Sequence, residues 1–172
     1  MLIERFNYTI DRWIAALDNY TISQLCTKPS SCEWSIGQVY IHLIQDTGFY
    51  LDQLKACIVD NEHTHESASP HVLAMLRNND FPDIVIEGHP SNAAIAQPGS
   101  SGQLLAGLTQ IRNEANALVT QIDGGTVNGK SLHPGFHYLS ANEWLQLAEM
   151  HLRHHFRQKA RIDDFLKREG IL

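Results

Sequence analysis

Two histidines near the C-terminus are spaced so that they could bind one metal ion. His151 and His155 are four residues apart in a stretch whose pattern predicts a helix, and residues at i and i+4 lie on the same helix face. Neutral imidazole is a common metal ligand. The alternative is a pair of core-edge histidines bonded to the backbone or to neighbouring glutamates. Spacing alone does not decide between them.

His42 is the candidate for a third ligand, because it lies on a separate predicted helix between two apolar residues, Ile41 and Leu43. Four-helix bundles commonly build metal sites from inward-facing side chains on different helices. Three histidine ligands leave a coordination position open, as catalytic sites do and closed structural sites do not. An ion held in this way would lower the pKa of a bound water or thiol, or polarise a carbonyl group.

Two further polar residues are predicted to orient ligands or a substrate around the ion. Gln38 lies one helical turn before His42, and His154 is adjacent to His155 but rotated toward another side of the helix. Side chains that contact metal ligands in this way fix their orientation. For His154 a surface position is the other interpretation.

The remaining histidines are weaker candidates. His133 and His137 precede the C-terminal helix, where they would rim a pocket or stabilise a turn. Four others occur in a polar region and are expected to be solvated: His63, His65, His71 and His89.

Hydrophobic residues at spacings of three and four predict four long helices, over residues 2–20, 35–60, 100–123 and 140–168. Three of them begin with a serine that is followed three residues later by glutamine or glutamate, the capping-box pattern. These pairs are Ser35 with Gln38, Ser100 with Gln103, and Ser140 with Glu143. With no convincing strand pattern, the predicted fold is an all-α four-helix bundle.

The region 61–100 lacks strong periodicity and is predicted to be a long crossover between the second and third helices. Within it, residues 71–76 could form a short helix and residues 83–87 an isolated strand. Residues 126–139 are expected to form a structured turn. A length of 172 residues fits one domain over residues 1–172.

Composition excludes several classes of function. The net charge of −6 argues against nucleic-acid binding, which needs a basic surface. There is no apolar run of transmembrane length and no signal-peptide pattern at the N-terminus, so a cytoplasmic location without membrane association is expected. The three cysteines are an odd number without CxxC spacing, which argues against a disulfide framework.

The motifs together resemble those of the DinB/YfiT-like superfamily. Trp34, Ser35, Gln38, His42 and Leu43 are similar to its W-S-x-x-Q-x-x-x-H-L motif. The C-terminal half resembles its H-P-x-x-G…W…H-x-x-H-H-x-x-Q pattern, through His133, Trp144, His151, His154, His155 and Gln158. One departure is His137, which stands near a position where relatives often carry glycine.

The resemblance implies a bundle of DinB/YfiT-like type, often a homodimer. It also implies a divalent metal ion, usually zinc or nickel, held by His42, His151 and His155. Relatives include metal-dependent hydrolases and transferases or isomerases that use a low-molecular-weight thiol as co-substrate. We therefore expect a metal-dependent hydrolase or thiol transferase acting on a small molecule. The alternative is a non-catalytic bundle that binds a small molecule or a partner protein.

Overall fold

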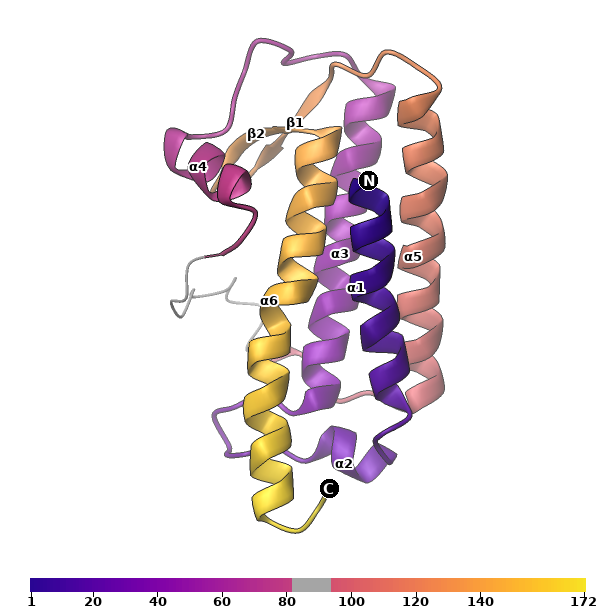
Figure 1. The fold of residues 1–172 in the computed structure, drawn as a ribbon, viewed down its shortest axis with the longest axis vertical. Coiled ribbons are helices and arrows are strands. Elements are labelled where there is room, and N and C mark those ends of the chain that lie inside the picture. The colour runs from indigo at the N-terminus through magenta and orange to yellow at the C-terminus, as the bar shows by residue number, and fades with distance from the viewer. Residues whose placement is uncertain (82–93) are drawn as a thin grey trace.

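The computed structural model describes residues 1–81 and 94–172, which form a bundle around four long helices (Figure 1). The helices are α1 (Leu2–Leu17), α3 (Ile36–Val59), α5 (Ser101–Asp123) and α6 (Ala141–Arg168). In the bundle, α3 packs against both α5 and α6, and α1 packs against the same two helices. The predicted all-α four-helix fold is confirmed, with its long crossover between α3 and α5.

Serine caps fix where the helices that carry the histidines begin. The Ser35 hydroxyl accepts a hydrogen bond from the Gln38 backbone N–H at 3.2 Å, and the Gln38 side-chain oxygen accepts one from the Ser35 N–H at 3.1 Å. Ser140 and Glu143 make the same reciprocal pair at the start of α6. These boxes satisfy backbone donors that a helix leaves without partners. They also fix the rotational phase of each helix, and therefore which residues face the interior.

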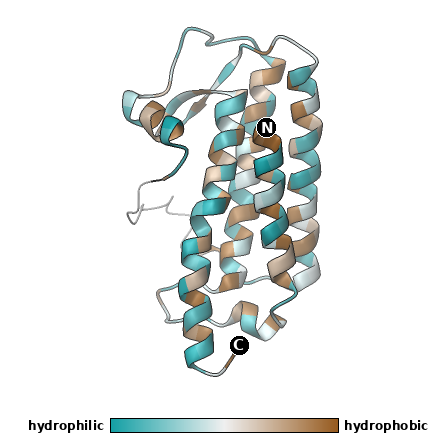
Figure 2. Ribbon diagram, in the orientation of Figure 1, coloured by the Kyte–Doolittle hydropathy of each residue, from teal (hydrophilic) through white to brown (hydrophobic). Residues whose placement is uncertain are grey.

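The core lies along the shared axis of the four helices. Figure 2 shows hydrophilic and hydrophobic residues interleaved along each long helix, the amphipathic pattern that buries one face and solvates the other. The largest completely buried side chains come from all four long helices and include Phe6, Trp13, Tyr40, Leu43, Leu104, Leu108 and Trp144. Burial of this apolar surface is the main driving force for assembling the bundle.

A short antiparallel hairpin precedes α6 and was not predicted as strands. It consists of β1 (Lys130–His133) and β2 (His137–Ser140), with Lys130 paired to Ser140 and His133 to His137. The expected structured turn is thus the turn of a hairpin. His137 has a φ of 64°, in the left-handed region that favours glycine. The structure therefore gives a physical reason for glycine near this position in relatives.

The crossover is described only in part. Two short helices accompany the four long ones. The first, α2 (Ile22–Cys26), precedes α3, and the second, α4 (Pro70–Asn78), lies in the crossover. The latter confirms the short helix predicted at 71–76. His63, His65 and His71 are exposed, as predicted. The strand predicted at 83–87 and His89 lie outside the described residues. No helix in the described part of the chain is long and apolar enough to span a membrane.

Candidate metal centre

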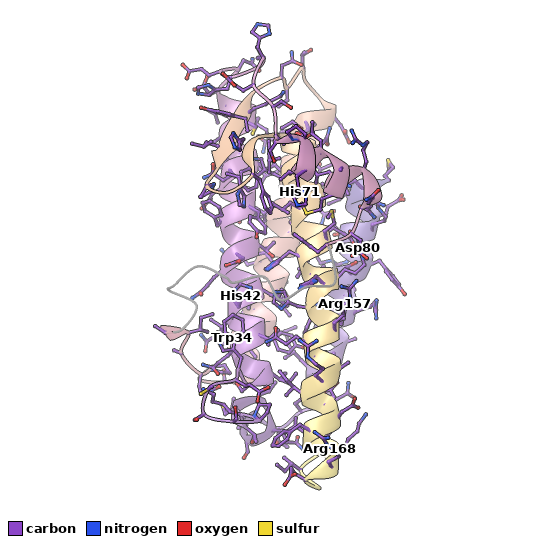
Figure 3. The ribbon with its side chains drawn as sticks, turned by 90° about the vertical axis from the view of Figure 1, so that its left-hand side faces the viewer. Trp34, His42, His71, Asp80, Arg157 and Arg168 are labelled. Atoms are coloured by element: carbon purple, nitrogen blue, oxygen red, sulfur yellow. The ribbon has the colours of Figure 1, made fainter. Side chains whose placement is uncertain are left out.

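The structure brings the three predicted ligands together inside the bundle. His42 comes from α3, and His151 and His155 come from α6. The Nε2 atom of His151 lies 3.1 Å from Nε2 of His42 and 3.0 Å from Nε2 of His155. All three donor atoms fall within 4.8 Å of one another. Figure 3 shows His42 on α3 at the level of Arg157, which follows His155 by two residues on α6.

The two helix starts determine this convergence. Ser35 caps α3, which places His42 two turns along it, on the buried face and 4% exposed. Ser140 caps α6, which places His151 three turns along, 9% exposed. His155 follows one turn later and is partly exposed. The cluster is therefore buried on the His42 and His151 side and reaches solvent on the His155 side.

Burial keeps the three imidazoles neutral near pH 7. Loss of hydration lowers the pKa of His42 from 6.5 to about 4. It lowers the pKa of His155 to about 3, with a further contribution from nearby His42. The pKa of His151 also falls well below its ordinary value, first through burial and then through its neighbouring histidines. Burial disfavours the charged form of a base, and neutral imidazole is the form that binds metal ions.

Gln158 determines which ring nitrogen of His155 carries the hydrogen. Its side-chain oxygen lies 2.8 Å from Nδ1 of His155, so Nδ1 carries the hydrogen and Nε2 presents a lone pair. With Nε2 of His155 unprotonated, any hydrogen in the two short contacts of His151 must come from Nε2 of His42 or His151. Nε2 of His151 carries either one hydrogen or one lone pair. Only one of its two short contacts can therefore be a well-aligned hydrogen bond. The other contact of His151 is then left without a hydrogen bond, and a cation bound to the lone pairs of all three Nε2 atoms would replace both contacts.

The donor set fits a divalent transition-metal ion. Zinc–imidazole bonds of about 2.0–2.1 Å in tetrahedral geometry separate the nitrogens by about 3.3 Å. Two of the three separations, 3.0 and 3.1 Å, are close to this value, and the whole group lies within 4.8 Å. The Nδ1 atoms of His42 and His151 are buried and make no hydrogen bond to the described residues. Their Nδ1–H groups would face away from an ion bound at Nε2.

Asp46 is a neighbour of the triad that the sequence reasoning missed. One carboxylate oxygen lies 3.5 Å from Nδ1 of His42, and the other lies 3.8 Å from Nε2 of His151. Its side chain is 33% exposed. The available signal was its spacing, since Asp46 follows His42 by four residues and must share its helix face.

Gln38 is engaged in structural hydrogen bonds. Its side-chain oxygen completes the cap at Ser35, and its side-chain nitrogen donates to the Ile95 carbonyl at 2.6 Å. The residue therefore joins the end of the crossover to the start of α3, one turn before His42. A direct role in holding a ligand stays a prediction.

His154 lies beside the triad, with its ring 5.5 Å from those of both Phe81 and His155. Phe81 follows Asp80, which is held on α6 by an ion pair with Arg157 at 3.2 Å; Figure 3 shows this pair alongside α6. His154 is half-buried, so the surface interpretation is only partly met. Its predicted role in orienting a ligand remains a prediction.

Aromatic rings surround the buried side of the cluster. The ring of Trp34 lies 4.9 Å from that of His42, and the ring of Tyr50 lies 5.6 Å from that of His151. Tyr50 also packs on Trp144, with ring centroids 5.8 Å apart. These rings limit the access of water from that side and lower the local polarity, which strengthens electrostatic interactions at the triad.

His133 of the hairpin makes its hydrogen bonds within the turn. Nδ1 of His133 accepts hydrogen bonds from the backbone N–H groups of Gly135 and Phe136, at 3.0 and 3.2 Å. Its ring also stacks on Phe136 at 4.3 Å. Burial lowers the pKa of His133 to about 4, which keeps it neutral and able to accept these bonds. His137 is exposed.

Comparison with known protein families places the chain among relatives of this architecture. The model of the DinB superfamily matches residues 5–158, which include all three histidines of the triad. The chain belongs to the DinB superfamily. A search of curated protein sequences finds no match.

One solved structure similar to this DinB chain is YfiT from Bacillus subtilis, described as a probable metal-dependent hydrolase with an unusual four-helix bundle topology. The two chains are 17% identical, with a TM-score of 0.61 over 98% of this chain and 86% of YfiT. At that identity the likeness establishes the fold.

Proposed function

We propose that this DinB protein binds a divalent metal ion through Nε2 of His42, His151 and His155 and uses it in hydrolysis. The observation that carries the proposal is the convergence of three neutral imidazole nitrogens from two helices. The solved relative YfiT is described as a probable metal-dependent hydrolase, which supports the choice of reaction. Three protein ligands leave a position open, as in catalytic zinc sites.

The residues around the triad have separate tasks in this proposal. A divalent ion bound here would supply Lewis acidity, polarising a carbonyl group and lowering the pKa of water or a thiol. Gln158 holds the His155 ring with Nε2 directed inward. Trp34 and Tyr50 pack against ligand rings and keep water from the buried side. Substrate would therefore approach on the side where His155 and Asp46 reach solvent.

Several finer features belong to the same proposal. Imidazole ligands suit zinc and nickel, and these are the ions we expect. Transfer of a low-molecular-weight thiol would use the same open position, since a thiol is activated by a metal ion as water is. A homodimer and a cytoplasmic location complete the proposal; light scattering and cell fractionation would test them.

A non-catalytic bundle that binds a small molecule or a partner is the second candidate, and one observation favours it. A surface groove of about 550 Å³ lies between α3 and α5, away from the histidines. It is lined by residues such as Gly48, Phe49 and Gly107. A small molecule bound there would not contact the triad. A metal-dependent enzyme, in contrast, should bind its substrate next to the ion.

Metal content of protein purified without a histidine tag tests the proposal. Wild-type protein should retain one equivalent of zinc or nickel after dialysis, because three ligands are preformed. The variant His151→Ala should lose it. The control is His71→Ala, which removes an exposed histidine on α4 and should leave metal content unchanged. Equal metal content in wild type and His151→Ala would exclude the site.

Turnover distinguishes the reactions. Metal-loaded protein should hydrolyse ester or amide substrates without added thiol if it is a hydrolase. Turnover that requires a low-molecular-weight thiol would instead identify a transferase. Metal binding at the triad without turnover, together with ligand binding in the α3–α5 groove, would favour the non-catalytic candidate.

A further inference from the structure

Asp46 is the acidic side chain that contacts two of the histidines on the two helices of the triad. Its carboxylate lies between α3 and α6, with one oxygen 3.5 Å from Nδ1 of His42 and the other 3.8 Å from Nε2 of His151. The first oxygen is therefore next to Nδ1, the nitrogen of His42 that would not bind the ion. The second oxygen is next to Nε2 of His151, where the three Nε2 atoms converge.

Nδ1 of His42 needs a hydrogen-bond acceptor once Nε2 binds an ion. In that state Nδ1 carries a hydrogen, and it is buried without a hydrogen bond to the described residues. The 3.5 Å separation from Asp46 exceeds an ordinary N–H···O bond of about 2.7–3.2 Å. For this bond to form in the metal-bound state, the separation of 3.5 Å must shorten by a few tenths of an ångström. Ligating histidines commonly donate to a carboxylate in this way.

The triad also lacks charge of its own. Burial keeps its imidazoles neutral, so the three ligands bring no negative charge to a divalent cation. A carboxylate oxygen 3.8 Å from a ligating nitrogen would supply a negative charge close to the ion, in a partly buried site where screening by water is reduced.

We propose that Asp46 is a positioning residue of this centre: one oxygen orients His42 through Nδ1, and the other supplies the negative charge that a divalent ion needs there. The inference rests on the metal binding proposed above. Gln158 performs the first task for His155, and Asp46 performs it for His42 and also supplies the charge to the ion. The site is then three histidines supported by two outer side chains, one neutral and one anionic.

Zinc affinity of three variants, measured with a competing chromophoric chelator, separates the two tasks. Asp46→Asn keeps an oxygen acceptor and removes the charge, whereas Asp46→Ala removes both. Asp46→Ala should weaken zinc binding by about 10- to 100-fold, with Asp46→Asn between it and wild type. The control Asp52→Asn removes the same charge from an exposed position on α3 and should bind zinc as wild type does. Circular dichroism of the metal-free variants verifies that each is folded.

The His42 Nδ1–H proton gives a second readout that a merely structural role would not change. In zinc-loaded wild type its nuclear magnetic resonance signal should be downfield and slow to exchange, and in Asp46→Ala it should exchange quickly. Unchanged zinc affinity and an unchanged His42 signal in Asp46→Ala would overturn the role of Asp46. If wild type binds zinc and His151→Ala does not, that result leaves the proposed function standing. Absence of zinc binding by wild type would overturn both.

Discussion

Replacing His42 with glutamine should remove one share, about 2 kcal/mol, of the stability that the metal-free protein loses between pH 7 and pH 5, since His133, His151 and His155 also have lowered pKa values. Burial lowers the pKa of His42 from 6.5 to about 4 in the folded chain. The unfolded chain therefore takes up this proton first as the pH falls. Stability is lost from about pH 6.5 downward and the loss is complete near pH 4, where the folded chain also takes up the proton.

The size of the effect follows from the same two pKa values. At pH 5 the unfolded chain is almost fully protonated at this residue and the folded chain is almost fully neutral, which corresponds to about 2 kcal/mol of lost stability relative to pH 7. Between pH 7 and pH 5, the His42→Gln variant should therefore lose about 2 kcal/mol less stability than wild type loses. Its removal also lessens the electrostatic lowering of the pKa of His155, which reduces the pH dependence further in the same direction.

Urea unfolding at pH 7 and pH 5, in the presence of a chelator, measures this difference. The control variant Ile41→Val trims a half-buried neighbour on α3 without removing a titrating group. It should be less stable than wild type at both pH values, by about 0.5–1.5 kcal/mol, and should keep the wild-type pH dependence. Equal losses between pH 7 and pH 5 in wild type and His42→Gln would refute the account of a buried, neutral His42.

Three further predictions concern the supports of the site. Ser140→Ala should lower the free energy of unfolding by about 1 kcal/mol by removing the cap of α6; an unchanged urea midpoint would contradict this. Gly37→Ala should cost about 1–3 kcal/mol, because its new methyl group would lie 2.6 Å from Pro98 and 2.9 Å from the Leu25 carbonyl; thermal unfolding tests it. Gln158→Ala should weaken zinc binding about 10-fold or more, measured by chelator competition, and wild-type affinity would exclude its role in orienting His155.

The helix starts and the convergence of the three histidines were predictable because both depend on local spacing. A serine followed three residues later by glutamine or glutamate satisfies helix backbone donors in any bundle, so Ser35 and Ser140 gave the correct starts of α3 and α6. With each start fixed, a period of 3.6 residues determines which histidines face inward. The resemblance to the DinB superfamily then paired His42 with the two histidines of α6.

Other features depend on contacts between distant segments. The hairpin before α6 has strands of only four residues each, too short for a clear alternating pattern, and it is stabilised by the turn contacts of His133. The contact of Asp46 with His151 was missed because the spacing of Asp46 from His42 shows a shared face but not a contact with α6. Likewise, the bond from Gln38 to Ile95 joins residues that the sequence separates by a long crossover.

Anomalous diffraction from crystals of the metal-loaded protein tests the central claim most directly. The account predicts one anomalous peak between α3 and α6, at about 2.0–2.1 Å from Nε2 of His42, His151 and His155, with Asp46 on its solvent side. A peak bound elsewhere, or no peak while the three histidines remain bonded only to protein atoms, would contradict it.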